Sequence, residues 1–375
     1  METFDVYTAV ILQTEVETVR KRAEIKTKNL RRIADIFERV GAYSASGKPP
    51  GCPSEYEMWA PVKLVALPEY CLQGNTFRYS MIDTAIEIPG EETDVFSDLA
   101  RKHDVFISCV ALERLPEFPG RYFNCNFIIG PDGKVIHKYH KFQATFHYEL
   151  TTSPHDIYEE YYQVFGKGRT RLQTFFPVAD TPIGKIGTLI CHDGRVNENW
   201  RALALNGAEI IIHGNFVEPT TSPPRDHREL GPRWNAVANM VYVIAPQLGA
   251  LIRPESVKYL QSGGSLIVDP DGAVIAHFPH PGEGMTSAVI RLDHLRRRRM
   301  DTGFNILAEL RTEVYAEMFK ESIYPPNALK EPIRDASEIY KKRDPRSLGV
   351  LQKLIDRGVL TPPKGFDPNS FGSAF

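Results

Sequence analysis

The stretch PIGKIGTLICHDGRVNENWR, residues 182–201, decides how the rest of the chain is interpreted. Its apolar run at 186–190 predicts a β-strand, Gly194 permits a tight turn, and residues 197–201 can open a helix. Cys191 therefore stands at an elbow between a strand and a helix. The positive end of that helix would favour thiolate over thiol, which suits a nucleophile. A buried structural cysteine is the alternative that this stretch leaves open.

Length and composition describe an ordinary globular protein. The 375 residues are 42% hydrophobic and 25% charged, with a formal net charge of −2, so we expect no nucleic-acid partner. Acidic residues flank the basic run at 296–299, which we interpret as a solvated helix face or a subunit contact. The sequence has no apolar window of roughly 18 residues, so we expect no membrane partner.

The spacing of the cysteines and histidines argues against disulfide bonds and against a metal-binding site. The five cysteines, at 52, 71, 109, 125 and 191, make an odd number without CxxC spacing, which is typical of a reducing compartment. We therefore expect a cytoplasmic protein. His137/His140 and His277/His280 are isolated pairs, so we predict no metal site and no cofactor.

Strand and helix patterns alternate through most of the chain. The predicted strands are 4–12, 63–67, 105–112, 123–130, 134–140, 186–190, 209–213, 240–246, 264–269, 273–278 and 287–292. The predicted helices are 15–40, 92–103, 200–206 and 226–239, with a loop at 41–53. Strands that are apolar on both faces and alternate with helices imply a sheet covered by helices. Pro-Asp-Gly turns at 131–133 and 270–272 suggest two similar halves.

The alternation of strand and helix patterns is interrupted at residues 142–180. They hold a Thr-Thr-Ser-Pro run and then the aromatic and acidic run YEEYY at 158–162. Because aromatic content argues against disorder, we expect an ordered insertion over a site, whose tyrosines could narrow or roof the pocket.

Three charged residues stand near the ends of predicted strands, where an α/β sheet displays reactive groups. Glu69 follows the strand 63–67, Lys141 follows the strand 134–140, and Glu149 comes eight residues later. Each alone is more often a solvated side chain. A thiol nucleophile, however, needs a base to move its proton and a cation to hold the oxyanion, and Glu, Lys and Cys supply these roles.

Three segments carry a family resemblance: LPEYCLQG (67–74), NFIIGPDGKVIHKYHK (126–141) and GKIGTLICHDGR (184–195). They resemble the nitrilase superfamily of carbon–nitrogen hydrolases, over about residues 5–295. The resemblance implies an α/β fold, a four-layer α-β-β-α sandwich, in which two such sandwiches pair through their outer helices. It also implies a catalytic triad of Glu69, Lys141 and Cys191, with Glu149 as the further glutamate of the aliphatic amidase and formamidase members.

The run Cys-His-Asp-Gly at 191–194 is closer to the amidase branch than to nitrilases, which tend to place Trp-Glu after the cysteine. We therefore expect an amide substrate, with a nitrile or an N-carbamoyl compound as alternatives and a catalytically silent scaffold as a minor one. The Lys-to-Cys interval is 191 minus 141, or 50 residues, and we attribute its length to an insertion at 150–180. The insertion should select something bulkier than formamide or acetamide.

These inferences give a set of predictions. Residues 1–300 form the hydrolase domain, and 301–375 form an extension that packs on a neighbouring subunit of a homodimer or larger homo-oligomer. The small-molecule amide is cleaved through a Cys thioester. The catalytic residues are Glu69, Lys141, Cys191 and Glu149, and His192, Asn215 and Phe216 are assigned to substrate binding.

Overall fold

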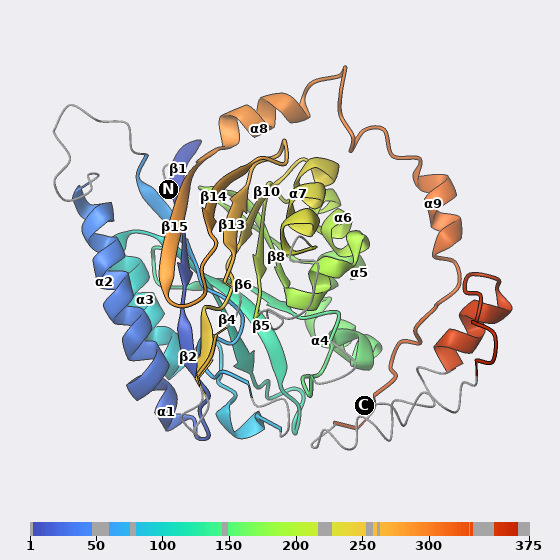
Figure 1. Ribbon diagram of the computed structural model, residues 1–375, viewed down its shortest axis with the longest axis horizontal. Helices are drawn as coiled ribbons and strands as arrows, with labels where there is room; N and C mark the ends of the chain where they lie inside the picture. The colour runs from blue at the N-terminus through green and yellow to red at the C-terminus, as the bar shows by residue number, and fades with distance from the viewer. Residues whose placement is uncertain are drawn as a thin grey trace.

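The computed structural model describes residues 3–46, 60–75, 80–144, 149–216, 227–252, 258–260, 263–329, 331–332 and 349–366. Within these ranges two six-stranded sheets lie face to face, and helices cover both outer faces (Figure 1). The predicted four-layer α-β-β-α sandwich is therefore confirmed.

The first sheet takes its strands from both ends of the hydrolase domain. In spatial order it holds β15 (Gly284–Arg291), β1 (Val6–Gln13), β3 (Val62–Ala66), β4 (Phe106–Glu113), β5 (Phe123–Ile129) and β6 (Val135–His140). β1, β3 and β4 run parallel, and the other neighbours pair antiparallel. The helices α2 (Arg31–Ser46) and α3 (Glu91–His103) cover its outer face (Figure 1).

The second sheet follows the same plan. Its spatial order is β14 (Val274–Phe278), β13 (Ser265–Val268), β10 (Tyr242–Ala245), β9 (Ile210–Gly214), β8 (Gly184–Ile190) and β7 (Val178–Thr181). The parallel strands β8, β9 and β10 form its centre. The helices α6 (Asn197–Leu205) and α7 (His227–Asn239) cover its outer face. Both Pro-Asp-Gly turns join antiparallel strands, as predicted, and both turn glycines have positive φ.

Three apolar clusters fill the spaces between the four layers. Side chains such as Phe37 and Phe96 pack under α2 and α3. Side chains such as Ile11, Ile186 and Ile212 fill the space between the sheets. A third cluster lies between the second sheet and α6. A strand that contributes to two clusters must be apolar on both faces, which explains the continuous apolar runs in the sequence.

The predicted helix at 15–40 is wrong at its start. Glu15–Glu17 form a short strand, β2, which pairs in parallel with β11 (Ala250–Ile252) beside β12 (Lys258–Leu260). The side chain of Asn29 holds the strand end, accepting from the Glu17 N–H at 2.8 Å and donating to the Glu17 carbonyl at 2.7 Å. This long-range pairing overrides the local helical pattern.

The helical segment then starts later and ends later than predicted. It begins with α1 (Ala23–Ile25), continues through a π-helical turn at Lys26–Leu30, and runs on in α2 to Ser46. Helix therefore replaces the first six residues of the predicted loop 41–53. The rest of that loop, including Cys52, lies outside the described residues.

The insertion is ordered within its described part, as predicted. It contains a 3₁₀ turn (Pro154–Ile157), α4 (Tyr158–Phe165) and α5 (Arg171–Phe175). The Tyr158 and Phe175 rings stack with centroids 4.7 Å apart, and Tyr161 packs in the same aromatic group. Tyr161 is buried between the insertion and the first sheet, where its hydroxyl pairs with His140.

The basic run lies in α8 (Leu292–Arg299) and contacts its own chain. Arg296 donates to both carboxylate oxygens of Glu209, at 2.7 and 3.0 Å. Arg299 donates to the carbonyl oxygens of Met240 and Ala208. Arg298 pairs with Asp271 in the turn between β13 and β14. Three of the four arginines therefore fasten α8 onto the second sheet of their own chain, instead of forming a solvated face or a subunit contact.

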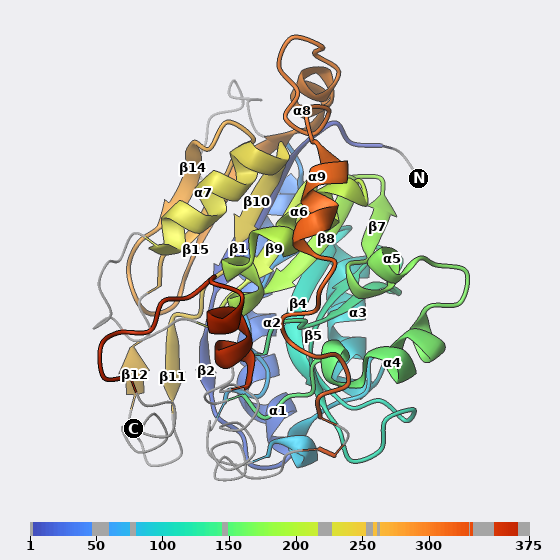
Figure 2. The ribbon, with the colours of Figure 1, turned by 90° about the vertical axis from the view of Figure 1, so that its right-hand side faces the viewer.

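The described part of the extension leaves α8, forms α9 (Thr312–Met318) and then returns to the insertion (Figure 2). The Asn327 N–H donates to the His155 carbonyl at 3.0 Å, and Arg121 Nη2 donates to the Leu329 carbonyl at 2.8 Å. The extension thus contacts its own hydrolase domain. Its predicted contact with a neighbouring subunit, and the division at residue 300, stay predictions.

The helices of the described residues are short. The longest, α2, has 16 residues, and none combines the length and the apolar character needed to cross a bilayer.

Candidate active site

Three strand ends bring the predicted triad together. Glu69 lies three residues after β3, Lys141 directly after β6, and Cys191 directly after β8. Glu69 and Lys141 are almost fully buried, at 0% and 2% exposure, and Cys191 is half-buried. Strands of both sheets therefore contribute to one site.

Lys141 is held between two carboxylates. Its Nζ donates to Glu69 Oε1 at 2.9 Å and to Glu149 Oε1 at 2.7 Å. Burial favours the neutral amine, but Glu149 and Glu69 outweigh it and hold the pKa of Lys141 well above its ordinary value. Lys141 is therefore an ammonium at neutral pH, which suits an electrostatic role and excludes a nucleophilic one.

Glu69 keeps one oxygen for chemistry. Its Oε1 accepts from Lys141 and from Asn124 Nδ2, the latter at 2.7 Å. Among the described residues, none donates a hydrogen bond of ordinary length to its buried Oε2. The Cys191 thiol is the nearby donor, and its longer contact with Glu69 lowers the pKa of Glu69 slightly. Burial nevertheless raises the pKa of Glu69 overall, against the effect of Lys141. A raised pKa suits a carboxylate that must accept and return a proton.

Cys191 adopts the predicted elbow, with a left-handed φ of 48°. The predicted preference for thiolate is wrong, because burial and then the Glu69 carboxylate raise the pKa of Cys191, against the opposing effect of Lys141. A 3₁₀ turn at Cys191–Arg195 separates the thiol from α6, which begins only at Asn197. The first residue of α6 is therefore too far from Cys191 for the helix dipole to stabilise the thiolate. A base must remove the proton of the thiol.

Asp193 braces the elbow from within. Its Oδ2 accepts from the Tyr139 hydroxyl at 2.9 Å and from the Ile190 N–H at 3.0 Å, and its Oδ1 accepts from the Gln143 N–H. Burial raises the pKa of Asp193 to about 6, against the lowering effects of Lys141 and of these donors. Asp193 thus ties the Cys191 turn to β6 and to the segment after Lys141.

Gly194 leaves room for a histidine. A Cβ at this position would overlap the His213 ring, whose Nε2 donates to the Cys191 carbonyl at 2.8 Å. Burial lowers the pKa of His213 to about 4, so the imidazole is neutral and carries its proton on Nε2. Trp200 Nε1 donates to the Gly194 carbonyl at 3.0 Å from the other side.

Glu149 also belongs to the site, as predicted. The Tyr70 hydroxyl donates to Glu149 Oε1 at 2.8 Å, so this oxygen accepts from both Tyr70 and Lys141. Tyr70 has a left-handed φ of 60°, directly after Glu69. Sequence reasoning missed Tyr70 and Asn124. Its only available signal was that Tyr70 adjoins Glu69.

The three residues assigned to substrate binding lie in different surroundings. The backbone of Phe216 hydrogen-bonds to Cys191 and lowers its pKa, and its ring meets Tyr70 edge-on at 5.5 Å. Asn215 is buried and donates to the His213 carbonyl at 2.7 Å. His192 is half-buried beside Cys191. Phe216 therefore borders the nucleophile, while substrate contact by any of the three stays a prediction.

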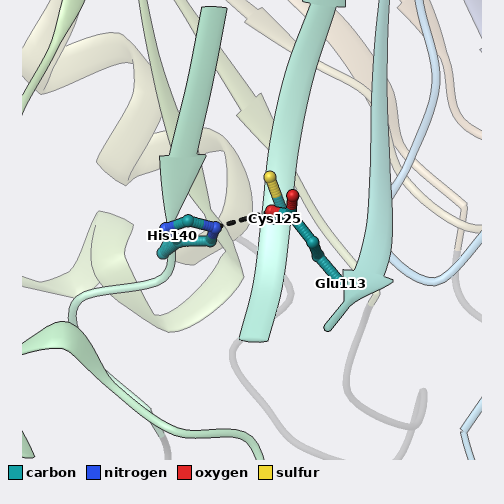
Figure 3. A group of neighbouring side chains, drawn as sticks. All are labelled: Glu113, Cys125 and His140. Carbon is teal, nitrogen blue, oxygen red and sulfur yellow. Dashed lines mark hydrogen bonds and ion pairs between the residues drawn. The ribbon is translucent and has the colours of Figure 1, made fainter. Parts of the chain in front are cut away.

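Glu113, Cys125 and His140 lie together on β4, β5 and β6 (Figure 3). The carboxylate of Glu113 is already in use, because Oε1 accepts from Lys138 at 2.6 Å and Oε2 pairs with His140 Nε2 at 2.7 Å. His140 Nδ1 pairs with the Tyr161 hydroxyl at 2.7 Å. Burial raises the pKa of Cys125 well above its usual range, so it stays a thiol. These contacts fit a hydrogen-bonded anchor for α4 better than a metal centre.

Comparison with known proteins agrees with this geometry. The family model described as carbon-nitrogen hydrolase matches residues 13–300. The omega-amidase NIT2 of Xenopus tropicalis is 30% identical over 275 residues, which cover 73% of this chain and 87% of that protein. The formamidase of Bacillus cereus (strain Q1) is 27% identical over 244 residues, which cover 64% and 62%.

Solved structures share the fold. Saccharomyces cerevisiae Nit3, a member of branch 10 of the nitrilase superfamily, superposes with a TM-score of 0.60 at 24% identity, covering 83% of this chain and all of that one. An amidase from Nesterenkonia sp. gives a TM-score of 0.57 at 15% identity, covering 83% and 96%. Since the matched family model spans most of the chain and the Glu69, Lys141 and Cys191 side chains meet at the ends of its strands, the chain belongs to the carbon–nitrogen hydrolase family.

Proposed function

We propose that the protein is an amidase that cleaves a non-peptide C–N bond through a Cys191 thioester and releases ammonia or an amine. The observation that carries this proposal is the buried Lys141 ammonium between Glu69 and Glu149, next to a thiol at a strand end. A scaffold protein has no need to bury one cation between two carboxylates, because that arrangement is costly to desolvate.

In the first half of the reaction, Glu69 removes the thiol proton and Cys191 Sγ attacks the amide carbonyl carbon. Lys141 and the backbone N–H that follows Cys191 stabilise the oxyanion of the tetrahedral intermediate. Glu69 then donates the proton to the departing nitrogen, and the intermediate collapses to the thioester. The raised pKa of Glu69 supports this exchange, because a carboxylic acid must survive long enough to protonate the amine.

In the second half, Glu69 again acts as a base and activates a water that attacks the thioester. The carboxylic acid leaves and Cys191 regains its proton. Glu149 assists at both stages by holding Lys141 in place through its Oε1, which Tyr70 fixes from the far side. A carboxylate in that position can also accept a hydrogen bond from the amino group of the amide.

An amide is favoured over a nitrile because amide cleavage forms an oxyanion and needs a proton for the leaving nitrogen. The relatives named as omega-amidase and formamidase support the same choice. The test compares kcat/KM for amides and nitriles that share one side chain. Faster conversion of the nitrile to the free acid would overturn the amide assignment and leave the triad standing.

The nucleophile is tested by Cys191→Ala. We expect at least a hundredfold loss of amide turnover with the fold retained, because the variant removes the attacking atom and little packing. Mass spectrometry of the wild-type protein with a slow amide should detect the acyl adduct on the tryptic peptide that contains Cys191.

The control uses the other described cysteines. Cys71, Cys109 and Cys125 are fully buried, so Ser or Ala variants there should change stability and leave the adduct on Cys191. Retained turnover in Cys191→Ala, or an acyl adduct on another cysteine, would contradict the assignment.

A further inference from the structure

A cavity of about 800 Å³ adjoins the catalytic centre. Its size lies within the range of about 300–1,000 Å³ that is usual for small-molecule pockets. Glu149 lines it and accepts from Lys141 at 2.7 Å, whereas the triad residues are not among its lining residues. Glu149 is therefore the residue that the cavity shares with the catalytic centre. We call this cavity the tail pocket, because residues 318–319, 321–324 and Leu329 of the C-terminal extension form one of its walls.

The other walls come from the insertion and from α6. Residues 149–153 and Phe176 belong to the insertion, and Ala202 belongs to α6. Hydrogen bonds fasten the extension beside this cavity: Asn327 N–H donates to the His155 carbonyl, Asn327 Oδ1 accepts from the Glu159 N–H, and Arg121 donates to the Leu329 carbonyl. The tyrosines of α4 are not among the residues that line the tail pocket.

The chemistry of the lining is mainly apolar. Phe142, Leu172, Phe176, Phe319 and Ile323 present aromatic and aliphatic surface to the cavity. A wall of this kind gains free energy by burying apolar substrate surface, at roughly 25 cal/mol per Å². An acetamide methyl group would leave most of the cavity filled with water.

The ionisable groups of the lining are mainly acidic. Carboxylates occur at positions 149, 156, 198, 321 and 331, against one guanidinium at 121. Lys141 compensates Glu149, and Arg357 lies 3.7 Å from Glu321. The remaining field disfavours a substrate that carries a carboxylate at its far end.

We propose that the tail pocket holds the acyl side chain of the substrate and that the enzyme therefore prefers primary amides with a large, uncharged, apolar acyl group. This inference rests on the proposed amidase function. It assigns a substrate-selecting role to the extension, which the family's core fold does not require.

The experiment measures kcat/KM for acetamide, 4-phenylbutanamide and adipamate, an amide that ends in a carboxylate. We expect 4-phenylbutanamide to exceed both by at least tenfold. Leu172→Trp fills the pocket, and Phe319→Ala removes part of its wall. Each variant should lower the ratio of kcat/KM for 4-phenylbutanamide to kcat/KM for acetamide about tenfold, mainly by raising KM for 4-phenylbutanamide.

Matched controls use exposed residues of the same type that do not line the pocket. Leu205→Trp on α6 and Phe304→Ala in the extension should leave all three values unchanged. If acetamide is cleaved as well as 4-phenylbutanamide, or if the pocket variants affect both substrates alike, the tail pocket is not the acyl site. If Leu172→Trp instead changes the particle mass in light scattering, the cavity belongs to a subunit interface and the proposal fails. Absence of any amide turnover would overturn the proposed function itself.

Discussion

Lys141 lies between two buried carboxylates, and this position explains why its charge is fixed. Glu69, Lys141 and Cys191 could be predicted because each follows a strand and because the family resemblance groups them, although no single position was decisive. Asn124 could not be predicted in this way, because it reaches Glu69 across 55 residues of sequence. The raised pKa of Cys191 also could not be predicted, because it depends on burial and on Glu69.

The role of Lys141 is tested by Lys141→Arg. Arginine keeps the charge, but its planar fork cannot reproduce one nitrogen placed 2.9 and 2.7 Å from two carboxylates. We expect kcat to fall by about a hundredfold or more, as for loss of one oxyanion donor. Lys138→Arg, on the strand that precedes Lys141 and paired with Glu113, is the control and should retain most activity. Wild-type kcat in Lys141→Arg would mean that charge alone suffices.

The tight packing at the elbow is tested by Gly194→Ala. The added methyl group would overlap the His213 ring, which is itself held by the Cys191 carbonyl, so the ring or the turn must move. We expect a loss of about 1–3 kcal/mol in the free energy of unfolding. In α7, Gly231→Ala meets nothing within 4 Å and should be neutral or stabilising by up to about 1 kcal/mol. Urea titration measures both variants, and equal effects would show that the ring adapts.

Among the elements, prediction was accurate where local signals bound a segment, as in the helix predicted at 92–103, which differs from α3 by one residue at its start. The predicted strand 123–130 differs from β5 by one residue, because an apolar run flanked by turns leaves few alternatives. The helix predicted from residue 15 began late, because β2 finds its partner in β11, more than 230 residues away in the chain. The insertion was predicted as ordered, with tyrosines that could narrow or roof a pocket. Tyr161 instead packs inward, because His140 offers it a buried hydrogen-bond partner.

The anchoring of α4 is tested by Tyr161→Phe. Without the hydroxyl, His140 Nδ1 loses its 2.7 Å partner in a buried site, and such an unpaired group costs about 1–3 kcal/mol. Tyr162→Phe is the matched control, because its hydroxyl donates to the Arg169 carbonyl at the surface and its removal should change stability by no more than about 0.5 kcal/mol. Urea unfolding compares the two. Equal losses would show that the Tyr161 hydroxyl contributes no more than a surface contact.

At the scale of the whole molecule, the sandwich was predicted from a resemblance carried by three short segments, and the three apolar clusters explain why it forms. Some large apolar side chains on the outer helices remain exposed to solvent in a single chain. Leu230 and Trp234 on α7 are 58% and 63% exposed, and Val314 on α9 is 61% exposed. Exposed large apolar side chains of this kind often mark protein–protein contacts when they gather in one patch. They are consistent with the expected pairing of subunits through outer helices.

We expect the protein to form a homodimer or a larger homo-oligomer, so that light scattering gives at least twice the 42.4 kDa of one chain. Trp234→Ser should weaken the assembly, because it removes apolar area from an outer helix, whereas Ile136→Ser, at an exposed position of β6, should not. Truncation before Pro325 tests the extension separately. A smaller particle that keeps its secondary structure by circular dichroism would show that the extension joins subunits. An unchanged particle mass would show that the extension contacts only its own chain and does not join subunits.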